Sequence, residues 1–279
     1  MRLIVRMQGG LGNQLFQVAF AHHVARRTGR RVIMDVSCLE RTTVNQPRSL
    51  EVSSKHSEIP FVALRPVRFR PADRLVKRLQ VVERDPTDQV LTRVRPYTTQ
   101  VIGYFQTAAT VEAEAGRMTR VVRAHLPTVA SVEPFVAVHV RLGDFLAVRS
   151  TREFHQACDP SWLLERGRQL LGEAGASQLR VFTDDVTNFE RLTGGTPRDV
   201  VVDDSTSSWV AISRMSHAEA LVMSNSTMSW WAAFTARHVH GRDIPVVCPT
   251  PWFAKASVFD ERIALAGWTR ELRQVLDED

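Results

Sequence analysis

The segment LIVRMQGGLGNQLF, residues 3–16, carries the clearest indication of the fold. A short apolar run ends in two glycines, and from Asn13 onward apolar residues recur at helical spacing until Thr28-Gly29 ends the helix. Arg31 to Asp35 reads as the next strand. A strand, a glycine turn, a helix and a second strand make a β-α-β unit, so the sequence predicts an α/β protein.

The same alternation starts again after Pro134, where FVAVHV (135–140) has the continuous apolar character of a strand buried on both faces. The further elements that we expect are a helix over 160–171, strands over 180–183, 200–202 and 220–223, a helix over 229–237 and a last strand over 244–248. The stretch from Thr42 to about Arg95 is irregular and rich in Pro and Arg. We therefore predict two α/β lobes, residues 1–130 and 131–279.

Composition and cysteine usage place the chain among globular proteins of a reducing compartment. The opening MRLIV lacks the apolar region of a signal peptide, and no window approaches the run of about 20 apolar residues that spans a bilayer. Cys38, Cys158 and Cys248 are isolated from one another in sequence. We expect a cytoplasmic protein.

A basic segment runs from Arg65 to Arg95, where nine Lys and Arg outnumber four acids. Three interpretations compete: a solvated surface, peripheral contact with an anionic membrane at its inner face, and a nucleic-acid site. The segment has few aromatics for base stacking and matches no nucleic-acid-binding motif, so nucleic acid is the weakest of the three.

The first candidate site is the glycine turn with Gly12, Asn13 and Gln14. Glycines and free N–H groups at a helix start suit an anion such as a phosphate. The alternative is a tight turn without a ligand. The segment fails as a dinucleotide fingerprint because Leu15 stands where close helix packing requires Gly or Ala.

The second candidate is HVRLGD, residues 139–144, at the carboxyl end of the predicted buried strand. Open α/β sheets place ligands at that end, and a guanidinium there can grip a pyrophosphate through two charge-assisted bonds. The alternative is a structural ion pair between Arg141 and Asp144.

Two more polar segments follow predicted strands. Asp184 and Asp185 could accept hydrogen bonds from a ribose or a guanine, or could cap the next helix. The segment SNSTMSWW, residues 224–231, offers hydroxyls and N–H groups to a diphosphate, or caps a helix that carries two core tryptophans. We expect no metal site, since no internal D-x-D and no ligand cluster is found.

Taken together, these segments resemble the α-1,2-fucosyltransferases, the inverting family also called glycosyltransferase family 11. Six motifs occur in the family's order: GGLGNQLFQ (9–17), GYFQ (103–106), HVRLGDF (139–145), FTDD (182–185), His217 with NSTMSWW (225–231), and PTPWF (249–253). The resemblance extends over nearly the whole chain.

This resemblance implies a GT-B-type fold, with two Rossmann-like lobes and the donor site in the cleft between them. It implies an acceptor-side N-terminal lobe and a C-terminal lobe that binds the GDP-sugar. The donor would be GDP-β-L-fucose and the acceptor the 2-hydroxyl of a galactose-terminated oligosaccharide, without a metal or other cofactor. The implied catalytic residues are Arg141, Asp144 and His139, and the implied donor-binding residues are Gly12, Asn13, Gln14, Asp184, Asp185, Asn225, Ser226 and Thr227.

Three departures from the family pattern bear on the donor. Leu142 replaces a second arginine, Phe145 replaces a tyrosine, and Ser208 stands where the family usually has an aspartate. If that aspartate reads guanine, the task falls here to Asp184, Asp185 or Asp204. The alternatives are a GT-B enzyme with another GDP-sugar or fucosyl linkage, a catalytically inactive sugar-binding module and, more remotely, a nucleic-acid-binding protein.

Overall fold

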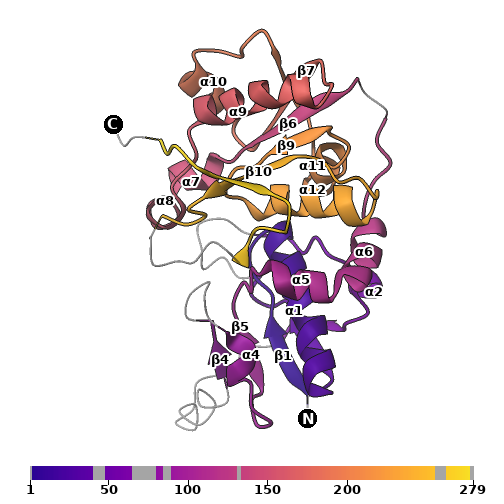
Figure 1. Cartoon of the computed structure of the whole chain (residues 1–279). Helices are drawn as coiled ribbons and strands as arrows, with labels where there is room; N and C mark the ends of the chain where they lie inside the picture. The colour runs from indigo at the N-terminus through magenta and orange to yellow at the C-terminus, as the bar shows by residue number, and fades with distance from the viewer. Residues whose placement is uncertain are drawn as a thin grey trace. The chain divides into compact units, whose positions relative to one another are not determined.

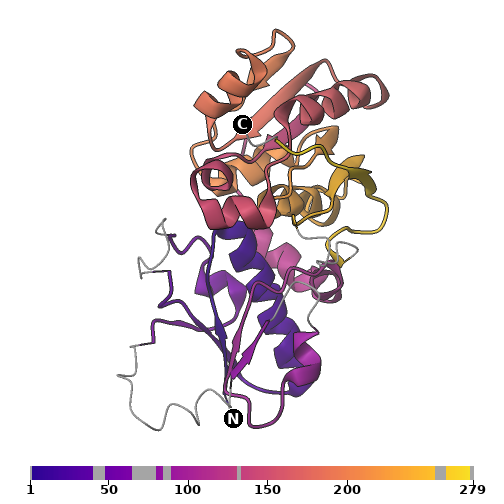
Figure 2. The ribbon, with the colours of Figure 1, turned by 90° about the vertical axis from the view of Figure 1, so that its left-hand side faces the viewer.

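The structure is a computed structural model that describes residues 2–39, 48–64, 80–83, 89–130, 133–254 and 262–276. It divides into an N-terminal unit, Met1–Ala124, and a C-terminal unit, His125–Asp279 (Figures 1 and 2). The boundary lies six residues before the one that we expected. Most of the basic segment (65–79 and 84–88) lies outside the described residues, so its contact with a membrane stays a prediction.

The N-terminal unit is built on a parallel sheet in the order β3-β2-β1-β5-β4. Its strands are β1 (Leu3–Arg6), β2 (Val32–Asp35), β3 (Phe61–Val62), β4 (Gln80–Val82) and β5 (Gln100–Ile102). Its helices are α1 (Leu11–Thr28), α2 (Ser54–Ser57), α4 (Val90–Arg93), α5 (Ala108–Ala113) and α6 (Ala115–Arg123). The predicted β-α-β unit is confirmed as β1-α1-β2, and Gly29 ends α1 in the left-handed conformation that glycine adopts easily.

The C-terminal unit has a parallel sheet in the order β11-β10-β9-β6-β7-β8. Its strands are β6 (Phe135–Val140), β7 (Gln178–Thr183), β8 (Val200–Val202), β9 (Ala220–Val222), β10 (Val246–Thr250) and β11 (Thr269–Leu272). Its helices are α7 (Gly143–Ala147), α8 (Arg149–His155), α9 (Pro160–Glu173), α10 (Val186–Thr193), α11 (Ser208–Met215) and α12 (Thr227–His238). In Figure 1, α9 and α10 lie on one side of this sheet, and α11 and α12 lie on the other.

Strand β6 is the centre of the C-terminal core. All six of its residues are buried, as the apolar run predicted, and α9 packs on it through Trp162, Leu163 and Leu164. Trp230 and Trp231 of α12 are fully buried on the other side, which confirms their expected place in the core. The expectation that the strand before Pro249 is the last one is wrong, since β11 pairs with β10 and extends the sheet.

In both sheets, as far as the structure describes them, the strand order reverses beside the strand that comes first in the chain, and this position is a topological switch point. In the N-terminal unit it lies between β1 and β5, and in the C-terminal unit between β6 and β9. Open α/β sheets bind ligands at the carboxyl ends of the strands at such points. The loops that leave β1, β5, β6 and β9 are therefore the places to look for a site.

Candidate functional site

Arg141 follows the carboxyl end of β6 and is held by two carboxylates. One terminal nitrogen of the guanidinium lies 2.5 Å from Asp144 Oδ1, and the other lies 2.9 Å from Asp184 Oδ2. The guanidinium also lies over the ring of Phe145, 5.8 Å from its centroid. Its side chain is 19% exposed, so it is fixed in direction but still reachable. A guanidinium carries five N–H groups, and these contacts leave donors for an anion.

Asp184 links two strand ends of the C-terminal sheet. Its Oδ1 accepts from the backbone N–H of Leu142 at 2.9 Å and of Gly143 at 3.3 Å, while its Oδ2 faces Arg141. A side chain at position 143 would collide with this carboxylate, so the glycine is required by the contact. The predicted ion pair of Arg141 and Asp144 is present, and Asp184 joins it as a second carboxylate. The geometry gives Asp184 a positioning role toward Arg141.

Asp185, which the sequence could not separate from its neighbour, has another role. It is the N-cap of α10, and its carboxylate accepts from Asn188 N at 3.0 Å and from Asn188 Nδ2 at 2.7 Å. This is the capping alternative that the sequence left open. Its contact with a donor stays a prediction.

The loop from β9 to α12 lies beside β6 and supplies the start of a 12-residue helix. Ser226 is the N-cap, with its hydroxyl accepting from Met228 N at 3.4 Å, and Thr227 is the first helical residue. Both are partly exposed, and the first turn contains no acidic residue. The positive end of the helix dipole and its N–H groups therefore suit an anion at this position.

Asn225 is 1% exposed and its amide nitrogen is fully used. It donates toward the carbonyls of His155 at 2.9 Å, Gln156 at 3.2 Å and Trp252 at 3.1 Å, and the Cys158 thiol donates to its Oδ1. Asn225 thus joins three loops around the site. This geometry gives it a structural role, and the expected donor contact stays a prediction.

His139 is fully buried below the same loop. Its Nδ1 lies 2.9 Å from Ser224 Oγ and 3.0 Å from Ser229 Oγ, and its Nε2 has no hydrogen-bond partner in the part of the chain that the structure describes. Burial, and secondarily the charge of Arg141, lower the pKa of His139 to about 3. A neutral ring without exposed surface favours a positioning role over contact with a substrate.

An aromatic cluster that sequence reasoning missed borders Arg141. His155 stacks on Phe145, with ring centroids 4.6 Å apart, and also contacts Phe154 and Phe253. Burial lowers the pKa of His155 to about 4, although the charge of Asp144 opposes that shift. No local motif marks His155, because its surroundings come from α7, α8 and a loop about 100 residues later.

In the N-terminal unit, the glycine turn is tied down by amides of α1. Gln14 is fully buried; its Nε2 donates to the carbonyls of Gly9 and Ser49, and its Oε1 accepts from Glu51 N. Gly12 is buried inside the first turn of α1, whereas Asn13 is partly exposed and accepts from Gln106 Nε2 at 2.8 Å. The predicted contacts of Gly12 and Gln14 with a donor stay predictions, and Asn13 is the one of the three that lies within reach of a ligand.

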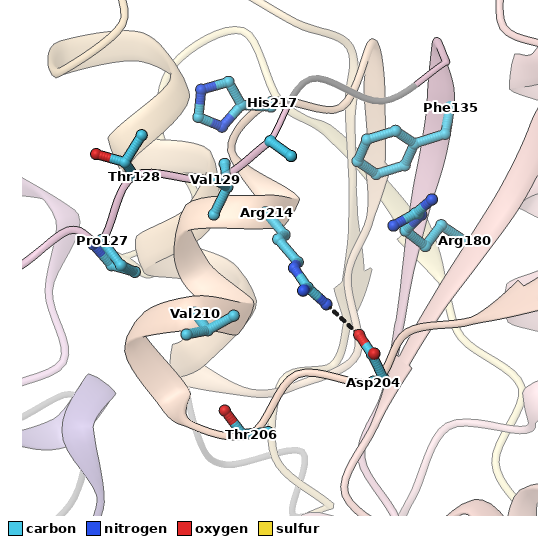
Figure 3. A pocket seen from close by; sticks show the side chains of 11 residues that line it. Pro127, Thr128, Val129, Phe135, Arg180, Asp204, Thr206, Val210, Arg214 and His217 are labelled. Carbon is cyan, nitrogen blue, oxygen red and sulfur yellow. Dashed lines mark hydrogen bonds and ion pairs between the residues drawn. The ribbon is translucent and has the colours of Figure 1, made fainter.

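A pocket of about 350 Å³ lies elsewhere in the C-terminal unit, between α11 and the segment 127–130 (Figure 3). Phe135, which begins β6, lines it, so it lies near the opposite end of that strand from Arg141. Its charged side chains are already paired: Arg214 contacts Asp204 at 2.5 Å and Asp203 at 3.1 Å, and Arg180 contacts Asp203 at 3.4 Å. Arg141 and the α12 N-terminus remain the better anion site.

Within the described ranges, no group of three or more His, Cys, Asp or Glu side chains could hold a metal ion. No helix in these ranges is long and apolar enough to cross a membrane.

The two units, each with a parallel sheet, have the two-lobed α/β architecture expected for GT-B glycosyltransferases. Arg141 and the N-terminus of α12 lie at the switch point of the second unit. Residues 97–271 match the model of Glycosyl transferase family 11, which is more than half of the chain. The chain belongs to glycosyltransferase family 11, and the family expected from the motifs is confirmed.

Individual relatives are distant. An alpha-1,2-colitosyltransferase of Escherichia coli is 22% identical over 91% of this chain and 93% of its own length. The O-antigen biosynthesis glycosyltransferase WbnK, also of Escherichia coli, is 30% identical over 42% of this chain and 39% of its own. Among solved structures, the fucosyltransferase NodZ from Bradyrhizobium is 16% identical, covers 83% of this chain and 92% of its own, and has a TM-score of 0.46.

Proposed function

We propose that this chain transfers L-fucose from GDP-β-L-fucose to the 2-hydroxyl of a galactose residue in a glycan, with inversion at the fucosyl carbon and without a metal. Membership in the family supports glycosyl transfer. The α-1,2 linkage is supported by the name of a relative that matches over 91% of this chain. We also propose a cytoplasmic location.

The observation that carries the proposal is the position of Arg141 at the switch point of the C-terminal sheet. Transfer breaks the bond between the fucosyl carbon and the phosphate oxygen, and forms a bond from that carbon to the acceptor oxygen. Negative charge grows on the departing GDP, and the acceptor hydroxyl loses its proton. Arg141 and the N-terminus of α12 are suited to stabilise that charge, which is the work that a metal ion performs in other transferases.

Asp144 and Asp184 prepare Arg141 for this role. Both carboxylates contact the guanidinium, at 2.5 and 2.9 Å, so its orientation is set before a donor arrives. Preorganised charge costs no rearrangement during the reaction. Asp144 is also the carboxylate nearest to Arg141 in the chain, and we retain it as the candidate general base.

A second donor is favoured by one comparison, since the relative matched over most of the chain is named for colitose. Colitose lacks the 3-hydroxyl of fucose but shares its remaining stereochemistry. Discrimination between these donors depends on whether a polar group of the protein pairs with that hydroxyl.

A donor panel tests the proposal. Release of the nucleoside diphosphate should be measured with GDP-fucose, GDP-colitose, GDP-mannose and a UDP-sugar, with lactose as acceptor and excess chelator present. We expect turnover with GDP-fucose that chelator leaves unchanged, and an α-1,2 product by NMR. A preference for GDP-colitose would mean that colitose, rather than fucose, is the sugar transferred. Activity lost with chelator and restored by Mn²⁺ would refute metal independence. Inactivity with every GDP-sugar would refute the proposed function.

A further inference from the structure

The switch point of the N-terminal unit has its own group of side chains, at the ends of β1 and β5. Gln17, fully buried in α1, holds the two loops together: its Nε2 donates to the carbonyl of Gly103 and its Oε1 accepts from Gln8 N, each at 3.0 Å. Asn13 and Gln106 form a second link between the same loops. The chain thus builds a fixed surface where open α/β sheets place ligands.

Tyr104 is turned outward on this surface by its neighbours. The carboxylate of Glu83 accepts from the backbone N–H of Tyr104 at 2.6 Å and of Phe105 at 3.1 Å, and Gly103 leaves no room for a side chain beside Glu83. Phe105 takes a φ of 54°, which is uncommon for a residue other than glycine, and its ring stacks on Phe20 with centroids 3.8 Å apart. Phe105 is therefore buried and Tyr104 is 43% exposed.

The ring of Tyr104 lies beside the side-chain amide of Asn13, whose nitrogen can donate a hydrogen bond. A Cβ added to Gly9 would lie 2.7 Å from Asn13 Nδ2 and 3.2 Å from Tyr104 Cε1, so the amide nitrogen and the ring are close neighbours across this glycine. Gln106 occupies Asn13 Oδ1, which fixes the direction of the amide. Asn13 Nδ2 has no hydrogen-bond partner among the described residues.

The ring and the amide suit a sugar, and Arg48 is the cation that acts on Tyr104 at this surface. A pyranose has an apolar face of C–H groups that packs on an aromatic ring, and a rim of hydroxyls that pair with amides. The Glu83 carboxylate is used by backbone N–H groups. Its neighbours bury part of Tyr104, which raises the pKa of its hydroxyl, although the charge of Arg48 opposes this shift.

We propose that Tyr104 is the stacking platform for a neutral hexopyranose of the acceptor, and that Asn13 Nδ2 donates a hydrogen bond to a hydroxyl of that sugar instead of to the donor, as the resemblance implied. This inference rests on the proposed function for the statement that the sugar is an acceptor. Glycine at position 9 keeps the platform open, because any side chain there would displace Asn13 and Tyr104.

The test compares Tyr104→Ala, Tyr104→Phe and Tyr97→Ala. Tyr97, the chain's other tyrosine, is 57% exposed and serves as the matched control. Tyr104→Ala should raise the KM for lactose at least about tenfold, as expected for the loss of a stacked ring. Tyr104→Phe should keep most of the affinity, and Tyr97→Ala should match the wild type.

Two readouts separate a platform from a general structural role. Hydrolysis of GDP-fucose without acceptor and the KM for GDP-fucose should be unchanged in Tyr104→Ala. A raised donor KM, or an unchanged lactose KM in a folded variant, would overturn the inference.

Direct binding keeps this test independent of turnover. A lactose titration followed by saturation-transfer NMR should give the same affinity for the wild type and Tyr97→Ala, and an affinity at least about tenfold weaker for Tyr104→Ala. Equal affinity of Tyr104→Ala and the wild type, or no binding by the wild type, refutes the platform. Lack of transfer by a wild type that binds lactose refutes the proposed function alone.

Discussion

The two switch points both lie beside the first strand of their sheet, but they differ in chemistry. In the N-terminal unit, neutral amides of Asn13, Gln17 and Gln106 hold the strand ends, and an aromatic ring is exposed. In the C-terminal unit, Arg141 and two carboxylates hold them. Charged groups can be arranged to meet a charge that develops during reaction, whereas amides and aromatic rings suit neutral hydroxylated ligands. We therefore expect the side chains at each switch point, rather than the fold, to determine which ligand binds there.

Removal of the Arg141 guanidinium should have the largest effect of the changes that test this difference between the two switch points. Arg141→Ala should lower kcat/KM at least about 100-fold, which corresponds to roughly 2.7 kcal/mol of transition-state stabilisation. Arg141→Lys should restore little, since an ammonium cannot replace the planar fork that faces two carboxylates. Arg168→Ala is the control, because Arg168 also pairs with a carboxylate, Asp199, but on an exposed surface. Equal turnover in folded Arg141→Ala and Arg168→Ala would refute the assignment.

A smaller effect should separate the adjacent aspartates. Asp184→Asn removes one of the carboxylates on Arg141 and should lower kcat/KM by about tenfold, or roughly 1.4 kcal/mol. Asp185→Ala removes a helix cap and should lower the free energy of unfolding by about 1 kcal/mol, with kcat/KM nearly unchanged. Urea denaturation and steady-state kinetics on both variants measure this difference. The opposite pattern would mean that Asp185 contacts the donor.

The switch point of the N-terminal unit should give the smallest effect, which paired glycine variants can isolate. Gly9 and Gly29 both have left-handed φ angles, 80° and 66°, but only at Gly9 would a Cβ meet other side chains. Each alanine should therefore cost about 1–2 kcal/mol of stability from backbone strain. Gly9→Ala alone should also raise the acceptor KM several-fold. An equal acceptor KM in the two variants would place the acceptor away from the glycine turn.

Predictions from the sequence were reliable where the residues of a single segment determine its structure. The apolar run of β6 predicted its bounds, and α1 begins at Leu11, two residues before the expected start. β11 was missed because Thr269–Leu272 is a largely exposed edge strand without an apolar run. The pairing of Arg141 with Asp144 was foreseen as an alternative, since the two lie three residues apart.

The rest of the site depends on contacts between distant segments. Asp184 accepts from backbone N–H groups more than 40 residues earlier in the chain. This contact distinguishes the role of Asp184 from that of Asp185, and the sequence around the two aspartates does not indicate it. The exposure of Tyr104 follows from the left-handed φ of Phe105, for which the sequence gives no indication. Motif similarity located both segments but could not assign their side chains to ligands or to the fold.

The burial of Asn225 has a consequence for production of the protein. Residues 225–227 form an N-S-T sequon, the acceptor sequence for N-linked glycans in the secretory pathway. The nitrogen to which a glycan would attach already donates to three carbonyls and is enclosed by the loops that it joins. A glycan added to the nascent chain would therefore keep these loops apart, so a secretory expression host would divert part of the product into misfolded material, whereas a bacterial cytoplasm would not.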